Sequence, residues 1–269
     1  MDLKILYEDN DLMAIDKPAG LIVFPEGDIS GEKTLIDHLL EKNPALKNVG
    51  EAPRHGIVHR LDKDTTGVLL VAKTPEALIF LQKQFSAHTF SSIGKSWDGS
   101  AQPAGGGGKN ESALEKKVEK KYIALVCGNV KEDNGTIHTF IGRAKGDPRK
   151  QKAYPLEHGE SKGLREAITE YKVLERFASY TLLEVQIKTG RKHQIRCHLA
   201  YLRNPIAGDK LYGFKDSPIP QGLERQFLHA GYLKIQLPTC ADRPSGQMKE
   251  FNSDLPEDLS KILKGLTKI

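Results

Sequence analysis

The first part of the chain alternates apolar and polar residues in a way that predicts paired strands. LKILYED and LMAIDK, within residues 3–17, are separated by the polar residues 9–11, so we expect a hairpin there. The turn residues Pro18 to Gly20 then lead into LIVF. Apolar residues recur with helical spacing from Thr34 to Glu41, which predicts a helix.

The next segment, IVHRLDKDTTGVLLVAKT at residues 57–74, favours a strand, a charged loop and a second strand. VLLVA is a short continuous apolar run, which is typical of a strand covered on both faces. Thr74 can cap a helix whose first residue is Pro75, and ALIFLQKQF continues that helix.

Strands dominate the rest of the chain. KKYIALVCGNV and GTIHTFIG are predicted strands, followed by RAKGDPRKQK as an exposed basic loop. A hairpin that turns near residues 178–179 is predicted by TEYKVLERF and SYTLLEVQIKTG. The pattern then predicts a helix in HQIRCHLAYL, a strand in LHAGYLKIQLP and a C-terminal helix in EDLSKILKGL. Because the strands lie in clusters, we expect an α+β fold with a mixed, largely antiparallel central sheet flanked by helices and loops.

We expect one domain over residues 1–269, with residues 94–112 as a flexible insertion. This segment, GKSWDGSAQPAGGGGKNES, is rich in Gly and Ser and has no periodicity. It is either a loop that faces the binding partner or a filler without a role, and we favour the filler.

Composition narrows the class of protein. The 269 residues are 38% hydrophobic, enough for a large core, and the net charge of +5 is a mild bias toward anionic partners. The three cysteines are far apart and form no CxxC, which argues against a disulfide framework and a cysteine zinc site. No apolar run approaches the roughly 18 residues of a membrane helix, and the N-terminus lacks a signal pattern, so we expect a cytoplasmic protein without membrane association.

Asp62 is the first candidate for chemistry. It precedes Thr65–Thr66–Gly67, and the glycine allows a tight turn before the buried strand, so the carboxylate is expected at a sheet edge. Burial would favour the neutral acid unless a cation is near. We nominate Arg196, because a guanidinium would keep the aspartate ionised and oriented, as a nucleophile requires. Lys192 is expected on the same helix face as Arg196, four residues away.

Plainer explanations exist for each residue. A loop aspartate before a threonine pair is ordinarily a turn or capping residue, and Tyr122 is ordinarily a strand tyrosine with a solvated hydroxyl. A metal-dependent hydrolase using His55, His59 and Asp62 is a further alternative, although their spacing matches no strong metal pattern. The residues alone therefore indicate a basic α+β protein with a candidate carboxylate–arginine site.

A family resemblance adds to this reading. HRLDKDTTG closely resembles the HRLDxxTSG signature of the RluA family of pseudouridine synthases. DNDLMAIDKPAGLIV resembles that family's N-terminal hairpin, KKYIALVCG its tyrosine-bearing strand, TGRKHQIRCHLAYLRNPIAGDKLYG its arginine motif and glycine–aspartate turn, and LHAGYLKI its last core strand. These blocks follow the family's order across residues 3–251. The resemblance implies isomerisation of uridine in ribosomal or transfer RNA without cofactor or metal, by a catalytic domain without an S4 domain, which we expect to be monomeric.

The resemblance also implies residue roles. Asp62 matches the catalytic aspartate, Tyr122 the tyrosine that stacks on the target uracil and is placed to take a proton, and Arg196 the partner of the aspartate. Arg60 matches a residue that helps to open the RNA, and Thr66 replaces the family's serine while keeping a hydroxyl. The expected substrate-binding residues are Arg60, Thr66, Arg191, His193 and Leu228.

Basic residues near these motifs are expected to contact phosphates and to make RNA binding sensitive to salt. They are Arg60, Arg143, Lys145, Arg149, Lys150, Lys152, Arg191 and Lys192. A catalytically silent RNA-binding module of the same fold is the remaining alternative, and the intact Asp62, Tyr122 and Arg196 argue against it.

Overall fold

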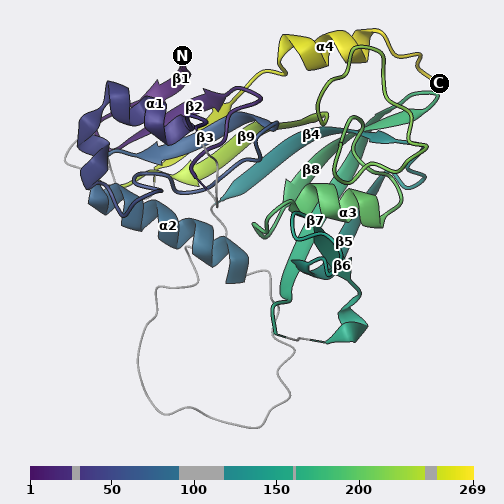
Figure 1. Cartoon of the computed structure of the whole chain (residues 1–269), viewed down its shortest axis with the longest axis horizontal. Coiled ribbons are helices and arrows are strands. Elements are labelled where there is room, and N and C mark those ends of the chain that lie inside the picture. Colours follow the sequence, from purple (N-terminus) through teal and green to yellow (C-terminus); the bar gives the residue numbers. More distant parts are fainter. Residues whose placement is uncertain (26–30, 91–117, 160–161, 240–246) are drawn as a thin grey trace.

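The computed structural model describes residues 1–25, 31–90, 118–159, 162–239 and 247–269 (Figure 1). Its strands are β1 (Lys4–Glu8), β2 (Leu12–Lys17), β3 (Thr66–Ala72), β4 (Glu119–Cys127), β5 (Asn134–Arg143), β6 (Gln151–Tyr154), β7 (Arg165–Arg176), β8 (Tyr180–Ile187), β9 (Leu228–Gln236) and β10 (Met248–Asn252). Its helices are α1 (Leu35–Lys42), α2 (Pro75–Phe90), α3 (Gln194–Tyr201) and α4 (Glu257–Lys264), with short 3-10 turns at Pro44–Asn48 and Leu156–His158. The expected α+β class is confirmed.

In these described ranges, the ten strands form one sheet in the order β1-β2-β3-β9-β4-β8-β7-β5-β6, and β10 pairs with β9. Neighbouring strands are antiparallel except β3 and β9, which run parallel where Thr66 faces His229 and Gly67 faces Ala230. Gly67 has a φ of +116°, and a Cβ atom there would lie 2.2 Å from the Ala230 carbonyl oxygen. Only glycine lets these two strands approach so closely.

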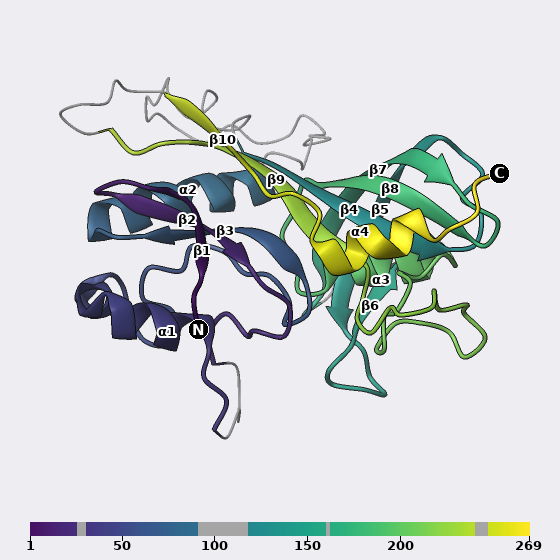
Figure 2. The same ribbon diagram turned by 90° about the horizontal axis from the view of Figure 1, so that it is seen from above.

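The helices cover the sheet at both ends. Figure 1 shows α1 and α2 at the β1–β3 end, α3 beside β6 and β7, and α4 at the top of the view, before the C-terminus; Figure 2 shows the same elements from above. Thr74 Oγ1 accepts the Ala77 N–H at 3.2 Å, as its predicted capping role requires. Further along α2, the Gln84 amide exchanges hydrogen bonds with the backbone of Gln236 and so fixes the helix to the end of β9.

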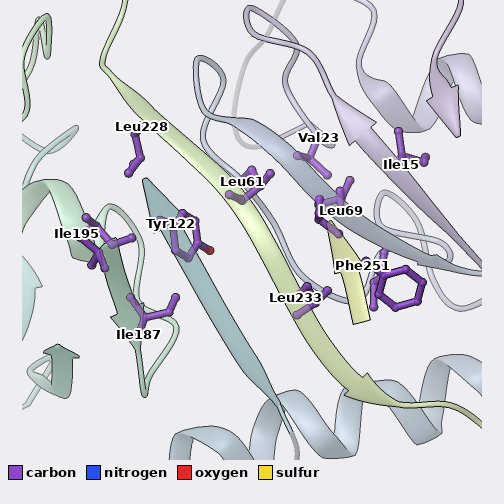
Figure 3. Close-up of a cluster of buried hydrophobic side chains, with 14 of the residues drawn as sticks. Ile15, Val23, Leu61, Leu69, Tyr122, Ile187, Ile195, Leu228, Leu233 and Phe251 are labelled. Carbon is purple, nitrogen blue, oxygen red and sulfur yellow. The ribbon is translucent and has the colours of Figure 1, made fainter. Parts of the chain in front are cut away.

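The hydrophobic core runs along the sheet. Every residue of β3 is buried, as its continuous apolar run predicted. Figure 3 shows core side chains from both halves of the sheet, with Leu69 and Phe251 at one side and Tyr122, Ile187 and Leu228 at the other. Of the three catalytic candidates, Tyr122 stands on one of these packed strands, whereas Asp62 lies in the loop before β3 and Arg196 lies on α3.

Three expectations about secondary structure were wrong or incomplete. IVHR is not a strand: it makes one isolated bridge, between Ile57 and Val71, because the His59 imidazole takes the Leu70 N–H that a partner strand would use. The basic loop after β5 is the tip of a hairpin, since Gln151–Tyr154 pairs with β5. The short edge strand β10 was not predicted.

Residues 94–112, the expected insertion, lie outside the described residues. In the described part of the chain, no helix has the length and apolar character needed to cross a bilayer.

Candidate active site

The loop that carries Asp62 is held by a buried lysine at the end of β2. Lys17 Nζ donates hydrogen bonds to the carbonyl oxygens of Pro18, Lys63 and Thr65 at 2.7, 2.9 and 3.0 Å. These three acceptors use all the N–H bonds of an ammonium group. Burial nevertheless lowers the pKa of Lys17 to about 7. The lysine therefore fixes the backbone of the loop at an energetic cost.

The segment just before β9 holds the same loop from another side. Gln226 Nε2 donates to Thr65 Oγ1 at 2.9 Å, and Arg225 Nη1 donates to the Asp64 carbonyl at 3.0 Å. Because these hydrogen bonds fix the backbone just after Asp62, the loop holds the Asp62 side chain in a defined position.

Arg196 lies between two carboxylates. Its Nη1 is 3.0 Å from Asp62 Oδ2, which is the ion pair expected from the sequence across 134 residues. Its Nε and Nη2 also bind Asp209 in a bidentate pair, at 2.7 and 2.8 Å. The side chain of Asp209 is fully buried, whereas that of Asp62 is 17% exposed. Asp62 is therefore the carboxylate of this trio that a ligand can reach.

The charges of the trio support one another. Burial opposes the charge of Arg196, but its hydrogen bonds and ion pairs with Asp209 and Asp62 raise its pKa above the ordinary arginine value. Burial would likewise raise the pKa of Asp209, but Arg196 and the N–H groups of Tyr212 and Leu211 hold it below its usual range. The guanidinium is thus a permanent cation fixed in orientation.

Tyr122, on β4, faces the same site. Its side chain is buried, and first burial and then the charge of Asp62 raise the pKa of its phenol. The phenol is therefore protonated at neutral pH. This state suits a stacking surface better than a base.

His193 completes the surroundings of Asp62. Its Nε2 is 3.9 Å from Asp62 Oδ1, and its Nδ1 lies 3.2 Å from the hydroxyl of Tyr212. Burial lowers the pKa of His193 to about 4, so the ring is neutral. His193 has a left-handed φ of 53° and precedes the first residue of α3, so Lys192 does not share a helix face with Arg196, contrary to expectation.

His59 is occupied by structural contacts. Its Nε2 accepts the Leu70 N–H at 3.0 Å, its ring stacks on Phe85 at 4.8 Å, and burial lowers its pKa to about 3. His59 is therefore not available as a ligand for the metal ion that the alternative hypothesis placed on His55, His59 and Asp62. Among the described residues, no group of three or more His, Cys, Asp or Glu side chains could hold a metal ion.

A cavity of about 470 Å³ opens beside Asp62. Its apolar part is formed by Leu61, Ile187, Ile195 and Leu228 around Tyr122 (Figure 3). Besides Arg196, six basic side chains line it: Arg54, Arg60, Lys120, Arg165, Arg191 and Lys192. Asp62 is the one acid among the described residues that line this cavity, so the site combines a partly exposed carboxylate with a strongly cationic wall. Asp62 and Arg196 also line an adjoining cavity of about 230 Å³.

The structure brings most of the expected residues together. Those that line the larger cavity are Arg60, Asp62, Tyr122, Arg191, His193, Arg196 and Leu228. Thr66 is not among them: it is buried and its Oγ1 lies 2.9 Å from His229 Nδ1, while the neighbouring Thr65 lines the cavity instead. Of the eight basic residues expected to contact phosphates, three line this cavity: Arg60, Arg191 and Lys192. The other five lie on or beside the β5–β6 hairpin: Arg143, Lys145, Arg149, Lys150 and Lys152.

Comparison with known proteins decides the family. Residues 11–93 and 109–201 match the family described as RNA pseudouridylate synthase. The protein named uncharacterized RNA pseudouridine synthase YlyB, from Bacillus subtilis, is 36% identical over 269 residues, which cover 100% of this chain and 74% of that protein. The chain belongs to the RNA pseudouridine synthase family.

Other relatives agree. The ribosomal large subunit pseudouridine synthase D of Nitrosomonas europaea is 38% identical over 273 residues, covering 99% of this chain and 66% of that protein. The solved structure of human RNA pseudouridylate synthase domain containing 4 has a TM-score of 0.66 at 24% identity, covering 97% of this chain and 92% of that chain, and so shares the fold. The enzyme is an RNA pseudouridine synthase, and the RluA-type resemblance of the sequence is confirmed.

Sequence reasoning missed several residues that shape this synthase's site. Asp209 and Lys17 stand in blocks that carried the resemblance, GDKLYG and DKPAG, but no spacing rule assigns them partners. Tyr212 and Lys120 were also missed. Their contacts are made across elements far apart in the chain, and only the folded structure displays them.

Proposed function

We propose that this synthase isomerises uridine to pseudouridine in large-subunit ribosomal RNA, with Asp62 as its nucleophile and without a cofactor. The observation that carries the proposal is the Asp62 carboxylate at the wall of a nucleotide-sized cavity, 3.0 Å from the fixed guanidinium of Arg196. The ribosomal target is supported by relatives named ribosomal large subunit pseudouridine synthase D.

The proposed reaction conserves all atoms. An Asp62 oxygen bonds to ribose C1′ while the C1′–N1 bond breaks and leaves its electron pair on the uracil. The base turns, C5 bonds to C1′, and the carboxylate departs. The C5 proton is then lost and N1 gains a proton. The net change is an isomerisation, so no oxidant or reductant is needed.

The state of Tyr122 bears on the route. In an alternative route through a glycal intermediate, a base removes the C2′ proton. The raised pKa of Tyr122 makes its phenolate scarce, so this tyrosine suits that role poorly. We propose that Tyr122 instead supports the face of the flipped uracil, next to the apolar side chain of Leu228. The direct attack of Asp62 on C1′ is therefore the route we favour.

The cationic wall supports an RNA substrate. The target base must leave its stack, which costs a few kcal/mol that pocket contacts offset. An anionic nucleophile also repels RNA phosphates, and the basic residues that line the cavity counter this repulsion. We expect RNA binding to weaken steeply with salt.

Pseudouridine mapping tests the target. The gene would be deleted in its source organism, and ribosomal and transfer RNA compared with those of the parent strain. We expect a pseudouridine to disappear from large-subunit ribosomal RNA and to return with the wild-type gene but not with Asp62→Ala. A loss confined to transfer RNA would contradict the ribosomal target, and restoration by Asp62→Ala would contradict the mechanism.

A further inference from the structure

The proposed mechanism assigns one buried lysine of the cavity, Lys120, no contact of its own with the substrate. Lys120 lies on β4, two residues before Tyr122, so the two side chains project from the same face of the strand. Lys120 is 8% exposed and lines the cavity. A buried ammonium without an acceptor is costly, which makes this residue unusual.

In the described part of the chain, the Lys120 ammonium group contacts an aromatic ring. The Nζ atom lies 5.3 Å from the centroid of the Phe85 ring, and the His59 ring also stacks on Phe85. Among the described residues, none forms a hydrogen bond or ion pair with its ammonium group. Burial lowers the pKa of Lys120 to about 8, so the group still carries its proton at neutral pH. An acceptor that arrives with a ligand would satisfy it.

Three groups are arranged in order through the cavity. Thr66, which follows the Asp62 loop, pairs with His229 of β9, and His229 also pairs with Ile123, the neighbour of Tyr122 on β4. Lys120 pairs with Leu233, four residues further along β9, so it lies farther from the Asp62 loop than Tyr122 does. A uracil with its C1′ at Asp62 and its face on Tyr122 would direct its opposite edge, with the C4 carbonyl, toward Lys120.

The chemistry of this edge matches an ammonium group. Lysine only donates hydrogen bonds, and the C4 carbonyl of uracil only accepts them. Cytosine has an amino group at C4, which would place donor against donor. A phosphate is a poorer match, because the backbone of a flipped nucleotide stays at the mouth of the site, where Arg54 and Arg165 are exposed.

We propose that Lys120 is a specificity-determining residue, whose ammonium donates a hydrogen bond to the C4 carbonyl of the flipped uracil and disfavours cytosine. This inference rests on the proposed function, since it assumes that Asp62 meets C1′ of a uridine in this cavity.

A mutant cycle tests the contact. Single-turnover rates would be measured for wild type and Lys120→Met on RNA that carries either uridine or 4-thiouridine at the target, because sulfur is a weaker acceptor than oxygen. A hydrogen bond to a charged group justifies an expected slowing of about ten- to hundredfold for Lys120→Met on uridine. We expect 4-thiouridine to slow the wild type by about tenfold, and to add little in the variant.

Lys121→Met is the matched control. Lys121 projects from the opposite face of β4, where its Nζ is 3.4 Å from Glu184 Oε1. We expect its substitution to leave both rates within about twofold of wild type. Lys120→Met itself should fold, since it removes a buried charge and leaves no described acceptor without a partner.

Each outcome decides the inference. If the rate reductions caused by Lys120→Met and by 4-thiouridine multiply when the two are combined, the contact does not exist. A wild-type enzyme that reacts equally fast with uridine and 4-thiouridine would also contradict the contact, and this comparison does not depend on any variant. A fall of about one in the salt-dependence slope of Lys120→Met would identify a phosphate as the ligand instead. An inactive wild type would overturn the proposed function, and an active wild type with independent penalties would overturn only this inference.

Discussion

At the scale of single residues, the sharing of Arg196 by two carboxylates decides how Asp62 can behave. Asp209 is fully buried and bidentate, so it neutralises the guanidinium. Asp62 then adds a second negative charge with one hydrogen bond, and the trio as a whole remains anionic. Asp62 is held in place without having its charge cancelled, which is what a nucleophile needs.

Replacing each aspartate by asparagine separates the two roles. In Asp209→Asn, the buried guanidinium loses its main counter-charge, so we expect the free energy of unfolding to fall by about 3 kcal/mol. In Asp62→Asn, Arg196 keeps Asp209, so we expect a change below about 1 kcal/mol. Urea denaturation measures both. Equal losses would mean that the two carboxylates are equivalent partners.

The ion pair between Asp62 and Arg196 could be anticipated from the sequence, because a carboxylate at a sheet edge needs a cation and the family motifs supply one. Asp209 could not be assigned in this way. A turn aspartate after glycine looks the same in a sequence whether it binds water or an arginine. Thr66 shows the converse: its hydroxyl was expected at the substrate, but strand alternation turns it toward His229.

At the scale of elements, the short parallel contact between β3 and β9 joins the two halves of the sheet. It brings the loop before β3, with Asp62, beside β9 and its neighbour β4, which carries Tyr122. The close approach depends on Gly67. The position of Asp62 relative to Tyr122 therefore depends on a backbone contact outside the cavity.

Gly67→Ala tests this dependence. The new Cβ would lie 2.2 Å from the Ala230 carbonyl oxygen, on a backbone with φ of +116°, so neither the space nor the conformation suits alanine. We expect the free energy of unfolding to fall by about 3 kcal/mol or more. Thermal or urea denaturation would measure this, with Gly146→Ala as a control because nothing lies within 4 Å of its Cβ position. A stability equal to wild type would contradict the tight β3–β9 contact.

Most elements were predictable because their patterns agree with their packing. VLLVA, with its continuous apolar run, is the clearest case. IVHR failed because a side chain, His59, replaced a strand partner. Gln151–Tyr154 and Met248–Asn252 were missed because short edge strands carry polar residues and have little periodicity.

At the scale of the whole molecule, the sheet buries several neutral histidines together with the active site. Burial lowers the pKa of His59 to about 3 and those of His193 and His198 to about 4. The unfolded chain would bind protons at these groups from about pH 6.5 downward, whereas the folded chain resists them to about pH 4. Folding is therefore penalised progressively through that range.

This linkage predicts that stability falls as the pH is lowered. Between pH 7 and pH 5 we expect a loss of a few kcal/mol in the free energy of unfolding, and His198→Gln should reduce that loss by about 2 kcal/mol. Urea denaturation at several pH values would show it. A stability independent of pH over this range would mean that these histidines are accessible to protonation in the folded state.

The central claim is that the Asp62 carboxylate carries out the isomerisation. Its most direct test is single-turnover release of tritium from C5 of uridine in ribosomal RNA, measured for wild type and Asp62→Asn together with their RNA affinities. The account predicts release by the wild type and none above background by the variant, with RNA affinity retained within a few fold. Release by Asp62→Asn at a rate near that of the wild type would contradict it.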